Sequence, residues 1–123
     1  PFLSCKKAID KKKENIVMDA ITNGVWVVQL YMEGSNDIST SFAGYEFQFY
    51  NNGTVEARQG ATTISGTWSG NIDNYSITAS FGQAVAPLPK LNATWMITDS
   101  YWDYVEAESG SSTQKNLLHL IKK

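Results

Sequence analysis

Two runs of alternating apolar and polar residues on either side of Asn52-Gly53 constrain the fold of this chain most strongly. In the first run Tyr45, Phe47 and Phe49 are aromatic and the residues between them are polar. A period of two on both sides of Asn-Gly predicts a β-hairpin with a tight turn. Because three rings share one face of the first strand, another part of the chain must cover that face.

Short runs of the same kind follow one another through the rest of the sequence, with Gly, Asn, Asp and Ser between them. No helical period interrupts these runs after residue 24, which favours strands joined in order by turns. Pro87 and Pro89 make residues 82–90 a loop, because proline cannot serve a central strand. The predicted strands span 25–33, the two arms of the hairpin within 42–59, 62–70, 75–81, 91–98, 100–108 and 115–122.

Eight consecutive strands without intervening helices indicate an antiparallel sandwich or barrel. A meander of eight strands curls enough to close on itself, and closure removes both bare edges. We therefore predict an all-β fold, an eight-stranded antiparallel up-and-down barrel that follows an N-terminal helix. Such an interior is filled by side chains or holds one small ligand. Tyr45, Phe47 and Phe49 are expected to point into it.

The N-terminal part has a different composition. Apolar residues at helical spacing predict a helix over 5–22, which Asn23-Gly24 ends, so residues 1–22 form a tether and helical segment and 23–123 the barrel. Cys5 follows a short apolar run and a small residue, and a lysine-rich run comes after it. This order is typical of a lipidated cysteine after a signal segment. It predicts an extracytoplasmic protein anchored to a membrane by lipid; the alternative is an ordinary cysteine near the start of the chain.

The first strand predicts its own inward face. If Trp26 points inward, strict alternation places Val28, Leu30 and Met32 on the same face, and Tyr31 on the opposite face. A shift of one residue would exchange the two sets. This prediction therefore depends on an unbroken alternation.

The last strand is apolar on both faces. Leu118 and Leu120 share one face, Leu117 and Ile121 share the other, and the sequence leaves open which pair points inward. A strand that is apolar on both sides is expected to be covered on the outside as well. The helix predicted over 5–22 is a candidate for that cover.

Several short motifs resemble the lipocalin family, and most closely the small lipocalin-like domains of bacterial, Bacteroidetes-type lipoproteins. They are Gly24-Val25-Trp26, Phe47-Gln48-Phe49, Gly53-Thr54-Val55 and Gly66-Thr67-Trp68. The resemblance covers residues 20–123. It implies that Trp26 caps the closed end of the barrel, that Lys122 or Lys123 packs across it, and that a small apolar or amphipathic ligand enters at the open end.

The candidate ligand-binding residues are mostly aromatic. Aromatic faces take up apolar rings and acyl chains, and tyrosine hydroxyls, here Tyr45 or Tyr75, can orient a ligand. The same side chains could instead simply fill the core. The candidates are Met32, Tyr45, Phe47, Phe49, Trp68, Tyr75, Trp95 and Trp102.

The sequence lacks patterns for other chemistry. His119 has no second histidine and only one cysteine in the chain with which to build a metal site. Asp99, Asp103, Glu106 and Glu108 alternate with aromatic residues, which favours a solvated face over a catalytic pair. The net charge of −2 provides no basic field for nucleic acid. We expect a protein without a cofactor, a metal or an enzymatic activity, and the oligomeric state stays open.

Two functions remain, and a third is weaker. The first is a ligand-binding lipocalin-like module, and the alternative is a filled barrel that acts as an interaction or inhibitor-like accessory module of the cell envelope. An enzyme that uses the barrel lumen would need at least two titratable groups converging there. A contiguous cavity of roughly 300 Å³ or more would favour ligand binding, whereas a solid interior would favour the interaction module.

Overall fold

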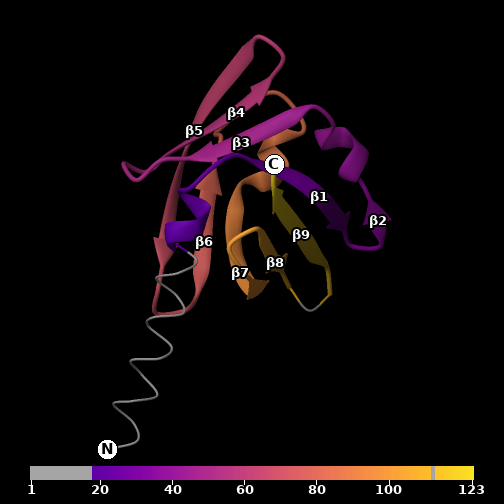
Figure 1. The fold of residues 1–123 in the computed structure, drawn as a ribbon. Helices are drawn as coiled ribbons and strands as arrows, with labels where there is room; N and C mark the ends of the chain where they lie inside the picture. Colours follow the sequence, from indigo (N-terminus) through magenta and orange to yellow (C-terminus); the bar gives the residue numbers. More distant parts are fainter. Residues whose placement is uncertain (1–17, 112) are drawn as a thin grey trace, which may run out of the picture.

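The computed structural model describes residues 18–111 and 113–123. A single antiparallel sheet curls into a closed barrel (Figure 1). Two 3-10 turns, η1 and η2, interrupt the connections between strands. The elements are β1 (Trp26–Glu33), β2 (Asn36–Asp37), η1 (Ser39–Phe42), β3 (Tyr45–Phe49), β4 (Thr54–Gln59), β5 (Thr62–Asn71), β6 (Ser76–Ser80), η2 (Leu88–Leu91), β7 (Ala93–Ser100), β8 (Tyr104–Gly110) and β9 (Lys115–Lys122).

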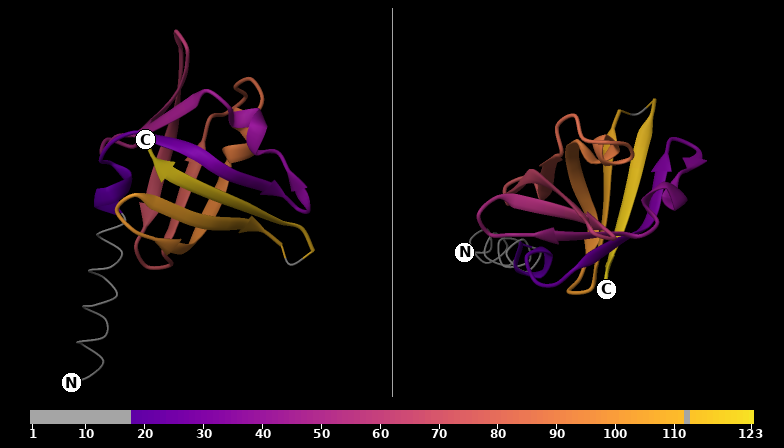
Figure 2. Two further views of the ribbon diagram at one scale, coloured as in Figure 1. Left: turned by 45° about the vertical axis from the view of Figure 1, so that its right-hand side comes forward. Right: turned by 90° about the horizontal axis from the view of Figure 1, so that it is seen from above.

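Pairing of the first and last long strands closes the barrel. β1 pairs with β3 on one side and with β9 on the other, and each remaining strand from β3 to β9 pairs with the next in sequence. The predicted eight-stranded up-and-down barrel is therefore confirmed. β2 is a two-residue addition that pairs only with the end of β1 and lies between the first two predicted strands. Seen from above, the strands surround the interior (Figure 2).

A short helical turn enters the barrel from the N-terminal side. Residues 18–21 are helical, and most of the helix predicted over 5–22 lies outside the described residues, as does Cys5. Ala20 and Ile21 are fully buried. The described part of this segment therefore covers one end of the barrel rather than the outside of β9 (Figure 2).

The β3–β4 hairpin forms as the sequence predicts. Gly53 has a φ of +88°, which glycine adopts without a steric penalty, and the Asn52 side chain accepts a hydrogen bond from the Thr54 N–H. Its strands then pair in continuous register. The three aromatic residues of β3 are all buried: Tyr45, Phe47 and Phe49.

A β-bulge in β1 reverses the alternation of its side chains. Val28 and Leu30 pair with consecutive residues of β9, so Gln29 is an extra residue. Beyond the bulge Tyr31 is buried and only 1% exposed, whereas Met32 is half-buried and lies outside the core cluster. The predicted inward orientation of Leu30 and Met32 is therefore wrong, because one inserted residue moves the following side chains to the other face.

The structure shows which apolar face of the last strand points into the barrel, a choice that the sequence left open. Leu118 and Leu120 of β9 are buried in the core, and Leu117 and Ile121 are half-buried on the other face. The register agrees with the bulge, because Tyr31 pairs with Leu118.

Gly66 allows two neighbouring strands to approach closely. A Cβ atom at this position would lie 2.4 Å from the Ser80 carbonyl oxygen and 2.8 Å from the Phe81 ring. Phe81 packs into that space and is 6% exposed. The Gly66-Thr67-Trp68 motif therefore has a steric basis in the packing of β5 against the end of β6.

Candidate functional site

The barrel lumen was the predicted site, and it is narrow. All the residues that line its cavity are apolar, and they come from the helical turn, from six of the eight barrel strands, and from the connection between β6 and β7. The cavity measures about 40 Å³. Sites for drug-sized ligands occupy roughly 300–1,000 Å³. In this conformation side chains fill almost all of the lumen.

One end of the barrel, here called the Trp26 end, is closed by the helical turn. Ile21 and Trp26 are fully buried, and the Trp26 indole N–H donates a hydrogen bond of 3.0 Å to the Ile21 carbonyl. The Lys122 ammonium lies 5.2 Å from the centre of the Trp26 ring, within the range of a cation–π contact. Lys122 thus takes the position that the lipocalin resemblance implies, whereas Lys123 pairs with Glu46.

The opposite end, here called the loop end, is closed by the two 3-10 turns. Phe42 of η1 is 2% exposed and stacks on Tyr31 with 5.3 Å between ring centres, and Leu88 of η2 is fully buried. The Tyr31 hydroxyl donates a 2.6 Å hydrogen bond to the Lys90 carbonyl, and the Lys90 ammonium pairs with Glu33 at 2.5 Å. Burial, together with the charge of Glu33, raises the pKa of Tyr31 to about 12. Tyr31 therefore stays a hydrogen-bond donor at neutral pH.

The loop that carries η2 is also fixed at both of its ends. Asn92 accepts a 2.6 Å hydrogen bond from the Phe81 N–H and donates one of 2.9 Å to the Gly82 carbonyl. The buried Trp95 indole N–H donates to the Leu91 carbonyl at 3.0 Å. Residues 82–92 therefore form an ordered closure of the loop end.

Half of the predicted ligand-binding residues meet in the lumen region. Phe47, Phe49 and Trp95 line the cavity. Tyr45 is buried beside them, with its ring 6.1 Å from that of Phe47. All four belong to the core cluster, so the structure unites them as packed core side chains. Their role in ligand binding stays a prediction.

Trp68 and Tyr75 lie at the margin of the core. The half-buried Trp68 ring meets Phe49 edge-on at 5.6 Å, and its indole N–H donates to the Tyr50 carbonyl at 2.8 Å. Tyr75 has a φ of +57° and its hydroxyl lies 2.6 Å from the Ser100 hydroxyl. Both rings pack against the core without lining the cavity.

Met32 and Trp102 are not brought to the lumen. Met32 lies beyond the bulge of β1, and Trp102 lies in the turn between β7 and β8, where it is 42% exposed. The sequence predicted that one strand ends at residue 98 and the next begins at residue 100, but β7 continues to Ser100 and the turn follows it. Trp102 is therefore a surface residue.

A second hollow lies on the outer wall, where β1, β7, β8 and β9 run side by side. We call it the outer groove, and it encloses about 490 Å³ that is open to solvent. Its polar lining includes three of the four acidic residues that the sequence grouped together; the fourth, Glu108, pairs with Lys115 at 3.3 Å. The groove is lined by Gln29, Asp99, Asp103, Tyr104, Glu106, Ile121 and Lys122.

The carboxylates of the outer groove have few partners. Asp99 accepts a 3.1 Å hydrogen bond from the Tyr104 hydroxyl, and this bond raises the pKa of Tyr104. Glu106 lies 3.8 Å from His119. Among the described residues, Asp99 and Asp103 form no ion pair within 4.0 Å. The groove therefore keeps an excess of negative charge.

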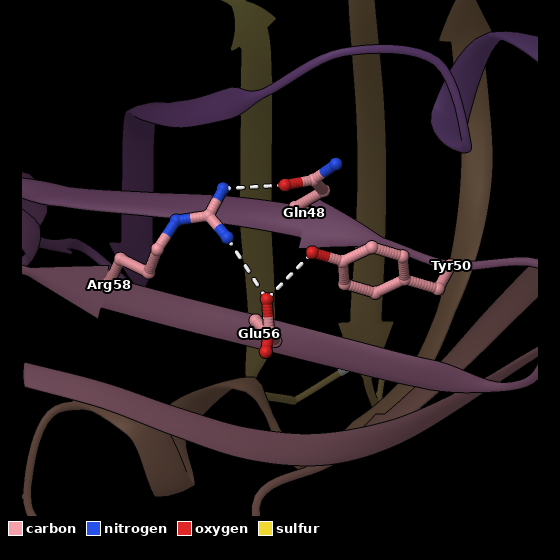
Figure 3. A network of polar contacts seen from close by, with 4 residues as sticks. All are labelled: Gln48, Tyr50, Glu56 and Arg58. Carbon is pink, nitrogen blue, oxygen red and sulfur yellow. Dashed lines mark hydrogen bonds and ion pairs between the residues drawn. The ribbon is translucent and has the colours of Figure 1, made fainter.

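A polar network on the outside of β3 and β4 involves the single arginine of the sequence (Figure 3). Arg58 donates to Glu56 at 3.0 Å and to Gln48 at 2.6 Å, and the Tyr50 hydroxyl donates to the same Glu56 oxygen at 2.7 Å. Because these groups satisfy one another, the network links the two strands. Sequence reasoning did not single it out; alternating polar residues in a hairpin carry only a general signal for such pairs.

A metal site and a membrane-spanning helix are both lacking in the part of the chain that the structure describes. Within residues 18–111 and 113–123, no three His, Cys, Asp or Glu side chains are arranged to hold a metal ion. No helix in the same ranges has the length and hydropathy needed to span a membrane.

Comparisons with known proteins support the fold. No model of a known protein family matches the chain, and no curated protein sequence matches it. A crystal structure of a DUF4847 family protein from Bacteroides vulgatus is similar in fold, with a TM-score of 0.61 and 14% sequence identity. The match covers 87% of this chain and 97% of that protein. The chain thus shares its barrel architecture with a protein from Bacteroides.

Proposed function

We propose that this protein is a filled barrel that acts through its outer surface, as an interaction or accessory module of the cell envelope. The cavity of about 40 Å³ carries this proposal. A lumen that accepts a drug-sized ligand needs roughly ten times this volume. Both ends are also occupied by buried side chains of the chain itself, Ile21 and Trp26 at one and Leu88 at the other.

The expected location of the module depends on Cys5. The residues around Cys5 have the order of a lipidated cysteine after a signal segment. A lipid at this position would tether the barrel through the segment that leads to its Trp26 end. In cells given a labelled fatty acid, the full-length protein should take up label and fractionate with membranes, and Cys5→Ala should do neither. Unchanged fractionation of Cys5→Ala would contradict the anchor.

Native mass spectrometry of protein purified from its own host tests the filled lumen. We expect the mass of the polypeptide with its modifications and no further non-covalent component. Adding an apolar fluorescent probe should give no enhancement beyond that of a β-barrel control with a solid core. A stoichiometric non-covalent lipid or aromatic compound would contradict the proposal.

A ligand carrier is the second candidate, and the composition of the lumen favours it. Every side chain that lines the cavity is apolar, and the loop end is closed by a loop rather than by a strand. Withdrawal of Leu88 and Leu91 would lengthen this apolar space toward the solvent. A ligand detected in the native protein, and lost from a variant with a narrowed lumen such as Ala107→Leu, would support the carrier.

A further inference from the structure

The turn between β7 and β8 carries the most exposed aromatic side chains of the barrel. Tyr101 is 62% exposed and Trp102 is 42% exposed, and every other aromatic residue in the described ranges is less exposed than these two. The Tyr101 N–H donates to the Tyr104 carbonyl at 2.9 Å, so the turn is closed by its own backbone. Large aromatic side chains held on an ordered turn are typical of the residues that contribute most to protein–protein binding.

The β7–β8 turn with Tyr101 and Trp102, here called the aromatic turn, borders the outer groove. Asp103 and Tyr104, which follow Trp102 directly, both line the groove. The backbone of Asp103 is also fixed to β9, because its carbonyl accepts a 2.9 Å hydrogen bond from the Lys122 N–H. The turn and the groove therefore adjoin each other, and the backbone of the turn is hydrogen-bonded to β9.

The charge of this surface selects the partner. Three carboxylates, Asp99, Asp103 and Glu106, face a single cation, Lys122, whose ammonium lies over the Trp26 ring. Such a field repels nucleic acid and anionic lipid and attracts cationic side chains. Arginine suits the surface especially well, because its guanidinium both pairs with carboxylates and stacks on aromatic rings.

We propose that the outer groove and the aromatic turn bind an arginine- or lysine-bearing segment of a partner protein. This inference rests on the proposed function, in which the barrel acts through its outer surface. The cationic side chains enter the groove beside Asp103 and Glu106, and the neighbouring part of the segment packs on Tyr101 and Trp102.

Short labelled peptides of arginine, of lysine and of serine–glycine, equal in length, test this directly on the purified full-length protein. Fluorescence anisotropy should show binding in the order arginine, lysine, serine–glycine, with the last undetectable. Amide chemical shifts should change at residues of β7, β8 and β9 around the groove. Absence of arginine-peptide binding, or shifts that concentrate elsewhere on the barrel, would overturn the proposal.

Matched variants separate a specific surface from general attraction. Asp103→Asn with Glu106→Gln should weaken arginine-peptide binding about tenfold, because both changes remove partners of the guanidinium. Asp19→Asn with Asp73→Asn changes the net charge equally at exposed positions outside the groove, and should keep the affinity within about twofold. Equal weakening by the two pairs would overturn the groove as the site.

The aromatic contribution has its own control. Trp102→Ala should weaken the arginine peptide about fivefold and the lysine peptide less, since guanidinium stacks better on the indole. Val85→Ala removes another exposed apolar side chain, 63% exposed in the loop that carries η2, and should have no effect. Equal effects of both substitutions would overturn the role of the turn.

Failure of all peptide binding would leave the filled barrel standing, whereas a lumen ligand in native mass spectrometry would contradict the proposed function instead.

Discussion

The two ends of the barrel are closed by different kinds of contact. At the Trp26 end, the indole hydrogen bond joins residues five apart in sequence, Trp26 and Ile21. At the loop end, the hydrogen bond from Tyr31 to Lys90 joins residues 59 apart. The first closure can form once β1 and the helical turn meet, whereas the second requires that most of the barrel be assembled. The Trp26–Ile21 closure should therefore form earlier during folding than the closure of the loop end.

Removing the ring at the Trp26 end should have the largest effect. Trp26→Ala deletes a fully buried side chain together with its hydrogen bond and its contact with Lys122. We expect the free energy of unfolding to fall by about 3–5 kcal/mol in urea denaturation. Trp102→Ala, at an exposed position, should change it by less than about 0.5 kcal/mol. Similar losses of unfolding free energy in both variants would contradict the role of Trp26 in closing this end of the barrel.

Truncating Leu88, which fills the loop end, should lower the free energy of unfolding less than Trp26→Ala does. The change should also affect a smaller part of the barrel. Leu88→Ala removes a fully buried leucine, and we expect a loss of about 2–5 kcal/mol, near the lower value because the loop can settle into the space. Amide hydrogen exchange should rise in the loop that carries η2 and stay unchanged around Trp26. Faster exchange throughout the barrel would show that the two ends do not open separately.

The tyrosine hydroxyl at the loop end gives a smaller, pH-dependent effect. Tyr31→Phe removes the hydrogen bond to Lys90 and should destabilise the protein by about 0.5–1.5 kcal/mol at neutral pH. The pKa of Tyr31 is about 12 in the folded protein against 10.0 for an unperturbed tyrosine. Because the folded state holds this proton more tightly, the contribution is complete below pH 10 and is lost as the pH rises through 12.

Urea denaturation at a series of alkaline pH values would test this sign. The free energy of unfolding should fall less steeply with pH in Tyr31→Phe than in the unmodified protein. Tyr101→Phe, which changes an exposed tyrosine, should leave the slope unchanged. A steeper fall in Tyr31→Phe would contradict the assignment.

The smallest effect should come from the ion pair over the loop end. Lys90→Gln breaks the contact with Glu33, in which the lysine side chain is 46% exposed, and should cost about 0.2–1 kcal/mol. The cost should shrink in high salt because exposed charges are screened. Lys115→Gln, which breaks the comparable pair with Glu108, is the matched control, because this pair does not involve the loop that carries η2. Only Lys90→Gln should increase exchange in residues 82–92.

The barrel could be predicted because its strands alternate strictly and are joined in order. The aromatic face of β3 follows directly from a period of two. The prediction fails in β1, where strict alternation places Met32 inward and the extra residue Gln29 brings Tyr31 there instead. A bulge has no distinct signature in a run that is apolar on both faces.

The candidate site was harder to predict than the fold. The sequence indicated which aromatic residues are core, but the volume that they leave depends on long-range packing. Leu88 lies in the loop predicted over 82–90, where no alternating pattern indicates which side chains point inward, and it is fully buried. Trp102 and its acidic neighbours became one surface only through the pairing of β7, β8 and β9.

Closure of the barrel also brings two distant parts of the chain together. The Lys123 N–H donates a 2.8 Å hydrogen bond to the Val25 carbonyl, so the last residue lies beside the start of β1. A short linker could therefore join these positions, and new ends could be placed at Gly60 and Ala61, which are exposed in the β4–β5 turn. The strands of this barrel form a closed ring. Their order along the gene is one of several circular permutations that keep the same strand pairings.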